Sequence, residues 1–354
     1  MKNIYSILSL LLGAMVALAS CQGEDIPGTQ IPEEDGMPIE FSGIQAWLET
    51  KADETETLPD NFTSFKVWAS RTIKVNNADQ TNYNVFSSAG TEVTKSEDAW
   101  IYSPVRYWQP GSYNFYAVSP ADLATGNLSA DGLTLSFGNN GWDLSSNQTD
   151  LLLATIPDVT GRFNTDNTPA PVKLTFNHML SKISFKARNA ESRNIAIAVT
   201  GIKIYGNSKT ATGVNGKYEN DTFCLTWALE NQTKKSSSFK EHTHIQAVSL
   251  PKTMNNSQYE YAEICSGFMV FPEEKCNLTI EVTLTQTFGD VTGGTTTMTK
   301  TATIEKVSWY PGYVYDYKLT VTADTIALDN EPDVTPWDNN KGTGGYDADD
   351  EIEF

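Results

Sequence analysis

Histidine and cysteine are scarce in this sequence. Its 354 residues include only three histidines and four cysteines. It also contains no Gly-x-Ser-x-Gly element, no phosphate-binding loop, no His-Glu-x-x-His and no Cys-x-x-Cys spacing. Serine hydrolases, nucleotide-dependent enzymes and zinc proteins depend on such arrangements, so no catalytic or metal centre is recognisable. We therefore predict that the protein is not an enzyme and uses no cofactor or metal.

Basic residues are also few. The chain has 25 Lys and Arg against 44 Asp and Glu, which gives a formal net charge of −19 at pH 7. A protein without a basic stripe cannot release counterions from phosphates, so nucleic acid is excluded as a partner. The same charge favours solubility and disfavours contact with anionic lipid surfaces.

The start of the chain has the features of an export signal. Lys2 supplies a positive charge, and the apolar run at 7–17 is too short to span a bilayer comfortably. The run is followed by Leu18-Ala19-Ser20-Cys21, which resembles the lipobox of bacterial lipoproteins. We predict a signal peptide at 1–20 and a lipid chain, such as palmitate, on Cys21. The alternative is an ordinary secretory signal with an unmodified cysteine.

Residues 21–37 form an acidic tether behind this cysteine. The tether begins with Gln22-Gly23-Glu24-Asp25, which resembles the acidic export signal of Bacteroides-type surface lipoproteins. We therefore expect the protein on the outer face of the outer membrane.

Residues 38–51, PIEFSGIQAWLETK, are predicted to form a half-buried strand with a bulge at Gly43. Its apolar residues alternate with one slip: Ile39, Phe41, Ile44, Ala46 and Leu48. No Lys or Arg occurs between Lys2 and Lys51, so a trypsin-like protease acting from outside meets its first cleavable bond directly after this strand. The acidic stretch that follows is expected to be an exposed linker. The alternative is that Lys51 opens an ordinary surface loop and the strand stays in place.

The body of the chain reads as all-β. Short alternating segments are separated by Asn, Asp, Ser and Gly, which indicates a β-sandwich. The clearest alternation lies at 313–321, where one face is apolar. The aromatic residues at 100–116 surround Pro110-Gly111 and predict a tight hairpin, whose rings belong either to the core or to a sugar-stacking platform.

Three cysteines follow Cys21, at positions 224, 265 and 276. An odd number in an exported chain leaves one thiol over if a pair bridges. The simplest pair is Cys265 with Cys276, and the alternative is three buried thiols.

Residues 324–354 predict a mobile acidic tail. They hold ten acidic side chains against Lys341 alone. Their apolar residues are interrupted by Pro332 and Pro336 and do not alternate cleanly.

A resemblance to a known family rests on several segments taken in order. They are YWQPGSYNFYAVSP, DLLLA, LTFNHMLSKISFKA, VSWYPGYVYDYKLTV and VTPW. Together they resemble the fimbrillin family of Bacteroides-type bacteria, the lipoprotein precursors of type V pilus subunits. The resemblance implies two tandem transthyretin-like β-sandwich domains, which we place at 38–188 and 189–323. It further implies cleavage after Lys51 by a trypsin-like protease, which leaves Ala52 as the new N-terminus.

In that family the groove opened by loss of the first strand receives a strand from the C-terminal region of another pilus subunit. The interrupted pattern at 324–354 departs from such a donor strand and favours a tip or accessory subunit, with adhesion to a host or bacterial glycan or protein as its task. The alternative is a monomeric surface lipoprotein that binds glycans.

Overall fold

The protein is described here by a computed structural model that covers ten stretches of the chain. They are 37–46, 62–97, 99–160, 170–205, 210–219, 222–229, 238–255, 258–289, 294–329 and 331–337, with the backbone alone for 43–46, 219, 238–245 and 254–255. Every regular element among them is a β-strand, which confirms the predicted all-β class. None of the described residues forms a helix long and apolar enough to cross a membrane.

The N-terminal half is built on an eight-stranded sheet in the order β1-β11-β10-β6-β2-β4-β5, with β3 on β2. Its strands are β1 (Phe41–Ala46), β2 (Ser64–Val75), β3 (Ala78–Asn82), β4 (Thr91–Ser96), β5 (Ala99–Ile101), β6 (Ser112–Ser119), β10 (Leu152–Thr160) and β11 (Val172–His178). The sheet curls until its edge strands β1 and β5 lie against each other. Alternate residues of each strand face the enclosed side, where they form a core rich in phenylalanine.

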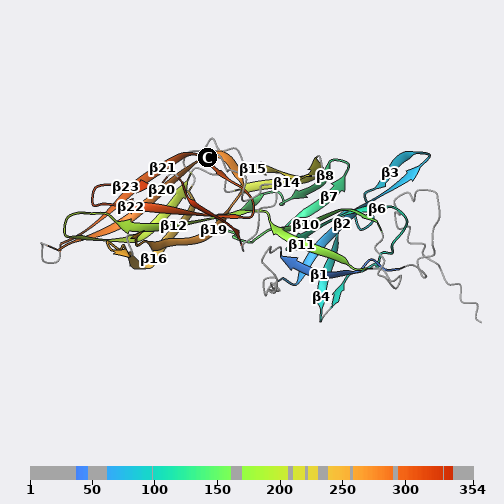
Figure 1. Cartoon of the computed structure of the whole chain (residues 1–354), viewed down its shortest axis with the longest axis horizontal. Helices are drawn as coiled ribbons and strands as arrows, with labels where there is room; N and C mark the ends of the chain where they lie inside the picture. Colours follow the sequence, from blue (N-terminus) through green and yellow to red (C-terminus); the bar gives the residue numbers. More distant parts are fainter. Residues whose placement is uncertain are drawn as a thin grey trace, which may run out of the picture.

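The C-terminal half is a sandwich of two sheets, which lies at the other end of the molecule (Figure 1). One sheet contains β19 (Ala262–Val270), β12 (Ser181–Asn189) and β22 (Tyr313–Val321), with β23 (Ile326–Leu328) and β24 (Asp333–Pro336) on the far side of β22. The other contains β16 (Ser238–Ser249), β13 (Ile195–Tyr205), β20 (Glu273–Phe288) and β21 (Thr295–Trp309). The apolar face predicted at 313–321 is confirmed, since Tyr313, Tyr315, Tyr317, Leu319 and Val321 are all buried.

A further sheet joins the two halves. It combines β7 (Thr125–Ser129), β8 (Gly132–Ser136) and β9 (Trp142–Asp143) with β14 (Thr210–Glu219) and β15 (Thr222–Leu229), so strands from both halves share one ladder. A small hairpin of β17 (Met254–Asn255) and β18 (Gln258–Tyr259) completes the described strands. At Gly126 a Cβ atom would lie 2.3 Å from the Trp68 ring, so glycine permits this sheet to pack on β2.

The predicted domain boundary between residues 188 and 189 needs a correction. β12 ends at Asn189, yet its partners are β19 and β22 of the C-terminal sandwich. Judged by strand pairing, the chain changes halves between β11 and β12. The division into two transthyretin-like sandwiches stays a prediction, because β7–β9 and β14–β15 form a sheet that belongs to both halves.

Two other expectations were wrong. Residues 106–108 do not form a hairpin with β6 about Pro110-Gly111, because β6 pairs with β2 and β10. Of the tail predicted at 324–354, residues 338–354 lie outside the described residues, but the part at 326–337 is folded onto the body. β23 and β24 pair with β22, and Trp337 is buried, so the interrupted apolar pattern is accommodated as two short edge strands.

Candidate functional site at the first strand

β1 lies at the edge of the N-terminal sheet and pairs in parallel with β11. The register is Phe41 to Val172 and Ser42 to Lys173, then Gln45 to Thr175 and Ala46 to Phe176. One extra residue of β1 is therefore inserted between Ser42 and Gln45, which is the predicted bulge at Gly43. A parallel partner about 130 positions away cannot be inferred from local pattern, and this pairing was not predicted.

The residues just before β1 are held by a second wall. Pro38 forms an antiparallel bridge with Tyr107, the Ile39 N–H donates to the Arg106 carbonyl at 2.7 Å, and the Trp108 N–H donates to Met37 at 2.9 Å. On the other side the Val172 N–H donates to the Glu40 carbonyl at 2.7 Å. The segment 37–46 therefore fills a slot between β11 and residues 106–108.

Tyr102 closes this slot from within. Its hydroxyl donates to the Ile39 carbonyl at 2.7 Å and accepts from the Arg106 N–H at 3.2 Å. Burial raises the pKa of Tyr102 to about 12, so the hydroxyl stays protonated and can donate at neutral pH. The density of aromatic residues at 100–116 was the only sequence signal for this wall, and it pointed to a hairpin instead.

Two side chains of the segment enter the N-terminal core. Ile39 is 0% exposed and Phe41 is 4% exposed, while Glu40 between them points to solvent. The Phe41 ring centroid lies 5.7 Å from Phe65 and from Tyr102, and 6.1 and 6.3 Å from Phe86 and Phe115. The start of the predicted strand is thus an integral part of a packed core rather than a surface attachment.

Comparisons with known proteins identify the family of the chain. A family profile described as fimbrillin-like matches residues 50–337. The chain belongs to the fimbrillin-like family. The match begins just beyond β1 and ends at Trp337, the last described residue. No curated protein matches the chain.

One solved structure supports the fold of this fimbrillin-like chain, and two others are similar to it over much of their length. A fimbrial protein from Bacteroides vulgatus is 18% identical with a TM-score of 0.51, and the alignment covers 77% of this chain and 92% of that one. The fimbrial anchor protein Mfa2 from Porphyromonas gingivalis is 11% identical with a TM-score of 0.34, covering 88% and 99%. The tip fimbrial protein Mfa3 from the same organism is 10% identical with a TM-score of 0.30, covering 77% and 94%.

The other predicted residues of this fimbrillin-like chain are described only in part. Ile44 and Ala46 lie on the backbone of β1, and nothing is described of their side chains. Leu48, Lys51, Ala52 and Cys21 lie outside the described residues. The cleavage site and the lipid attachment therefore stay predictions.

The predicted disulfide is not formed. Cys224, Cys265 and Cys276 are all present as thiols. Cys265 lies on β19 and Cys276 on β20, which belong to different sheets of the sandwich. Burial is the main cause that raises the pKa of Cys276 above its ordinary value, and the nearby Glu273 adds to it.

Four of the aromatic side chains in the range 100–116 are buried. Trp108, Tyr113, Phe115 and Tyr116 are each at most 8% exposed. Their faces pack against other core rings, as in the 4.9 Å contact between Trp108 and Tyr113. These rings therefore do not form a platform on which a sugar could stack.

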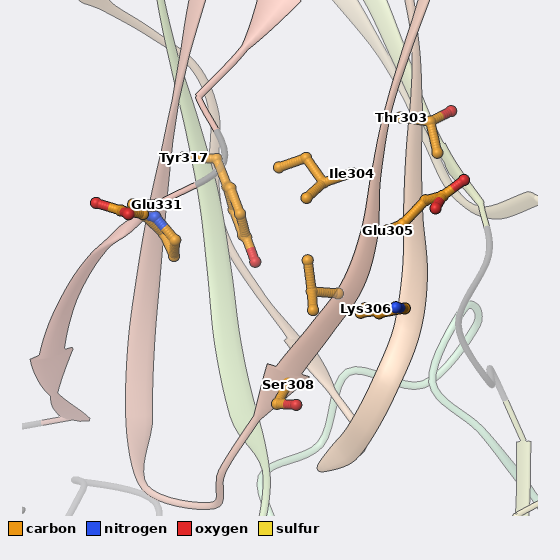
Figure 2. A pocket seen from close by; sticks show the side chains of 9 residues that line it. Thr303, Ile304, Glu305, Lys306, Ser308, Tyr317 and Glu331 are labelled. Carbon is orange, nitrogen blue, oxygen red and sulfur yellow. The ribbon is translucent and has the colours of Figure 1, made fainter. Parts of the chain in front are cut away.

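A hollow of about 470 Å³ opens elsewhere, in the C-terminal sandwich between β21 and the residues that join β23 to β24. Figure 2 shows Ile304 and Tyr317 pointing into the gap, with Glu305, Lys306 and Glu331 around it. The Tyr317 hydroxyl accepts a hydrogen bond from Trp309 Nε1 at 3.0 Å, so it is engaged in the core. Among the described residues no group of three His, Cys, Asp or Glu side chains could hold a metal ion.

Proposed function

We propose that this protein is a pilus subunit whose first strand is a temporary occupant of the slot. The chain is exported with a lipid on Cys21, is cut after Lys51 by a trypsin-like protease, and loses β1. A strand from another pilus subunit then fills the slot. The protein thus resides first at the outer membrane and later in a fimbrium.

One observation carries this proposal. The segment that would leave is hydrogen-bonded on both edges, to β11 and to residues 106–108, and places Ile39 and Phe41 inside the core. Its departure would uncover two adjoining apolar sockets and two rows of unpaired backbone groups. Such a slot is suited to one kind of ligand, an extended strand with apolar residues two positions apart.

The energetic demand for a replacement strand is large. Burying an Ile or Phe side chain contributes about 1.5–3 kcal/mol each, and the cavities left behind add to the loss. Each buried backbone group left without a partner costs about 1–3 kcal/mol more. Whole domains are stable by only about 5–15 kcal/mol, so an empty slot would leave the N-terminal half marginal. A strand from a neighbour would restore both the apolar contacts and the hydrogen bonds.

The position in the pilus is proposed to be the tip or an accessory site. Residues 326–328 and 333–336 pair with the chain's own β22, and Trp337 is buried against the body. While they are docked in this way they are not presented to a neighbour as a donor strand. This arrangement supports a subunit that accepts a strand without offering this part of its chain, and that contacts a host or bacterial glycan or protein.

The experiment that tests the proposal compares Lys51→Ala with Lys74→Ala in cells that produce the pilus. Lys74 lies exposed on β2, so its loss is a matched control for charge. We expect the native protein and the Lys74→Ala control to start at Ala52 and to enter high-mass polymers. Lys51→Ala should keep the uncut strand and remain monomeric while folding normally. Polymers formed at the native level by Lys51→Ala would refute the proposal.

A further inference from the structure

β11 is attached very unequally on its two sides. On one side it pairs with β1 from Val172 to Phe176. On the other side it pairs with β10 only at its last residues, Asn177 and His178. The ladder partners of 172–176 are thus supplied by β1, and His178 is the point at which β11 joins the rest of the sheet.

His178 also packs against Trp337, the last described residue of the chain. The Trp337 indole lies flat on the imidazole, with ring centroids 4.1 Å apart and an angle of 6° between the planes. Asp150 fixes the imidazole of this pair, because its Oδ2 atom lies 2.7 Å from His178 Nδ1. His178 and Trp337 are 6% and 8% exposed, so the stack is nearly excluded from water.

The other attachments of the C-terminal segment, residues 331–337, are to the C-terminal half, and they include an ion pair of 2.6 Å between Asp333 and Lys318. β24 is four residues long and pairs with Tyr313–Asp316 of β22, and the Trp337 N–H donates to the Gly312 carbonyl at 2.7 Å. The Lys182 Nζ atom lies 4.9 Å from the centre of the indole. Stacking on His178 therefore joins this short segment to the N-terminal half.

A crevice of about 590 Å³ marks the place where these parts meet. Trp337 and Lys182 line it from one side, and Asp150, Leu152 and Phe62 from the other. Phe62 is the first residue described after the predicted cleavage site, and its ring lies 5.0 Å from Phe176 of β11. Three parts of the chain thus adjoin one another here. They are β11, the residues that begin at Phe62 after the predicted cleavage site, and the C-terminal segment at Trp337.

We propose that the stack of Trp337 on His178 couples occupancy of the β1 slot to docking of the C-terminal segment. This inference rests on the proposed loss of β1. An empty slot removes the ladder partner of 172–176, loosens β11 back to His178 and withdraws the surface on which Trp337 rests. A filled slot, whichever strand fills it, seats Trp337 and holds β24 on β22. After β1 has been lost, the subunit is thereby rigid at both ends only once it has received a strand from a neighbour.

Coupling of this kind is reciprocal. If an empty slot loosens the docking of Trp337, then loss of Trp337 must weaken binding of a strand to the slot, by at most the same factor. Packing couplings through one contiguous element usually change an equilibrium by about 2- to 30-fold, which sets the size of effect to expect.

The first test uses the intact chain and hydrogen exchange of the amides at 333–337. Phe41→Leu loosens β1 mildly, and Phe41→Ala does so strongly. We expect exchange at 333–337 to accelerate about 2- to 30-fold in these variants, while exchange in β20 stays unchanged. In a Trp337→Ala background the same Phe41 substitutions should no longer alter the exchange rate at 333–337. Ile326→Ala on β23 is the matched control. It should accelerate exchange at 333–337 by the same factor whether Phe41 is native or substituted, because Ile326 lies on a strand that pairs with β22 and not with β11.

The second test uses the chain cut by trypsin after Lys51 and freed of β1, to which a synthetic peptide of residues 38–51 is added. We expect the peptide to slow exchange at 333–337, and Trp337→Ala to weaken peptide binding by up to the factor by which the peptide slows that exchange. Unchanged exchange in the Phe41 variants and on adding a peptide that binds would overturn the coupling and leave the pilus proposal intact. A cut chain that binds no peptide would instead overturn the pilus proposal, while the intact-chain test still decides the coupling.

Discussion

Phe41→Ala is the substitution that tests most directly whether β1 is part of the core. Phe41 is 4% exposed and lies within 6.3 Å of four aromatic rings, so little collapse of the site around alanine is expected. Replacing a buried Phe by Ala costs about 3–5 kcal/mol, and the aromatic pairs place this site toward the upper end. That is a large share of the about 5–15 kcal/mol that stabilises a domain.

The measurement is guanidinium unfolding of the intact chain, with hydrogen exchange of β2 and β11 amides to follow the N-terminal half. A chain of two packed halves need not unfold in one step, so a local probe is required. Glu40→Ala is the control, because its side chain is exposed between two buried ones and should change stability by less than about 0.5 kcal/mol. A loss below about 1 kcal/mol for Phe41→Ala would refute the reasoning, since removal of β1 would then open no socket.

Two further predictions concern other buried groups. Hydrogen bonds from the Arg193 side chain and from backbone N–H groups lower the pKa of Glu191 below its ordinary 4.5, so the carboxylate should stabilise the fold above that pH and progressively less as the pH falls. Glu191→Gln should accordingly be less stable than the native chain at pH 7, and the difference in melting temperature should shrink below pH 4.5; a constant difference would contradict this. A thiol reagent should modify half-exposed Cys224 in the folded protein but reach Cys265 and Cys276 only after unfolding, without added reductant; fewer than three reactive thiols in the denatured mature chain would mean that a bridge forms.

Local pattern was sufficient for two strands that have one buried face. The alternation at 313–321 and the slip at Gly43 both reflect side chains that must reach a core from a pleated backbone, and both were read correctly. The burial of Ile39 and Phe41 belongs to the same kind of inference. These features depend on neighbours one or two residues away.

Features that depend on distant partners were missed. The second wall of the slot pairs 106–108 with 37–39, across about seventy positions of sequence, and its aromatic residues suggested a nearer partner. The C-terminal strands were missed for another reason. Pro336 ends β24 at the edge of a sheet, where a missing N–H costs little, so proline did not exclude a strand there.

The two walls together restrict what the slot can accept. An incoming strand must run parallel to β11 and antiparallel to 106–108, so only one chain direction satisfies both rows of hydrogen bonds. Its register is restricted as well, because a slip by one residue would direct into the core the side chain that should take the exposed position of Glu40, and would expose those that should fill the positions of Ile39 and Phe41. A charged side chain turned inward in this way would be buried without a partner, which costs more than the hydrogen bonds return. If strand exchange takes place as proposed, a slot of this construction would select its strand by direction and by the spacing of two apolar side chains, and not by hydrophobicity alone.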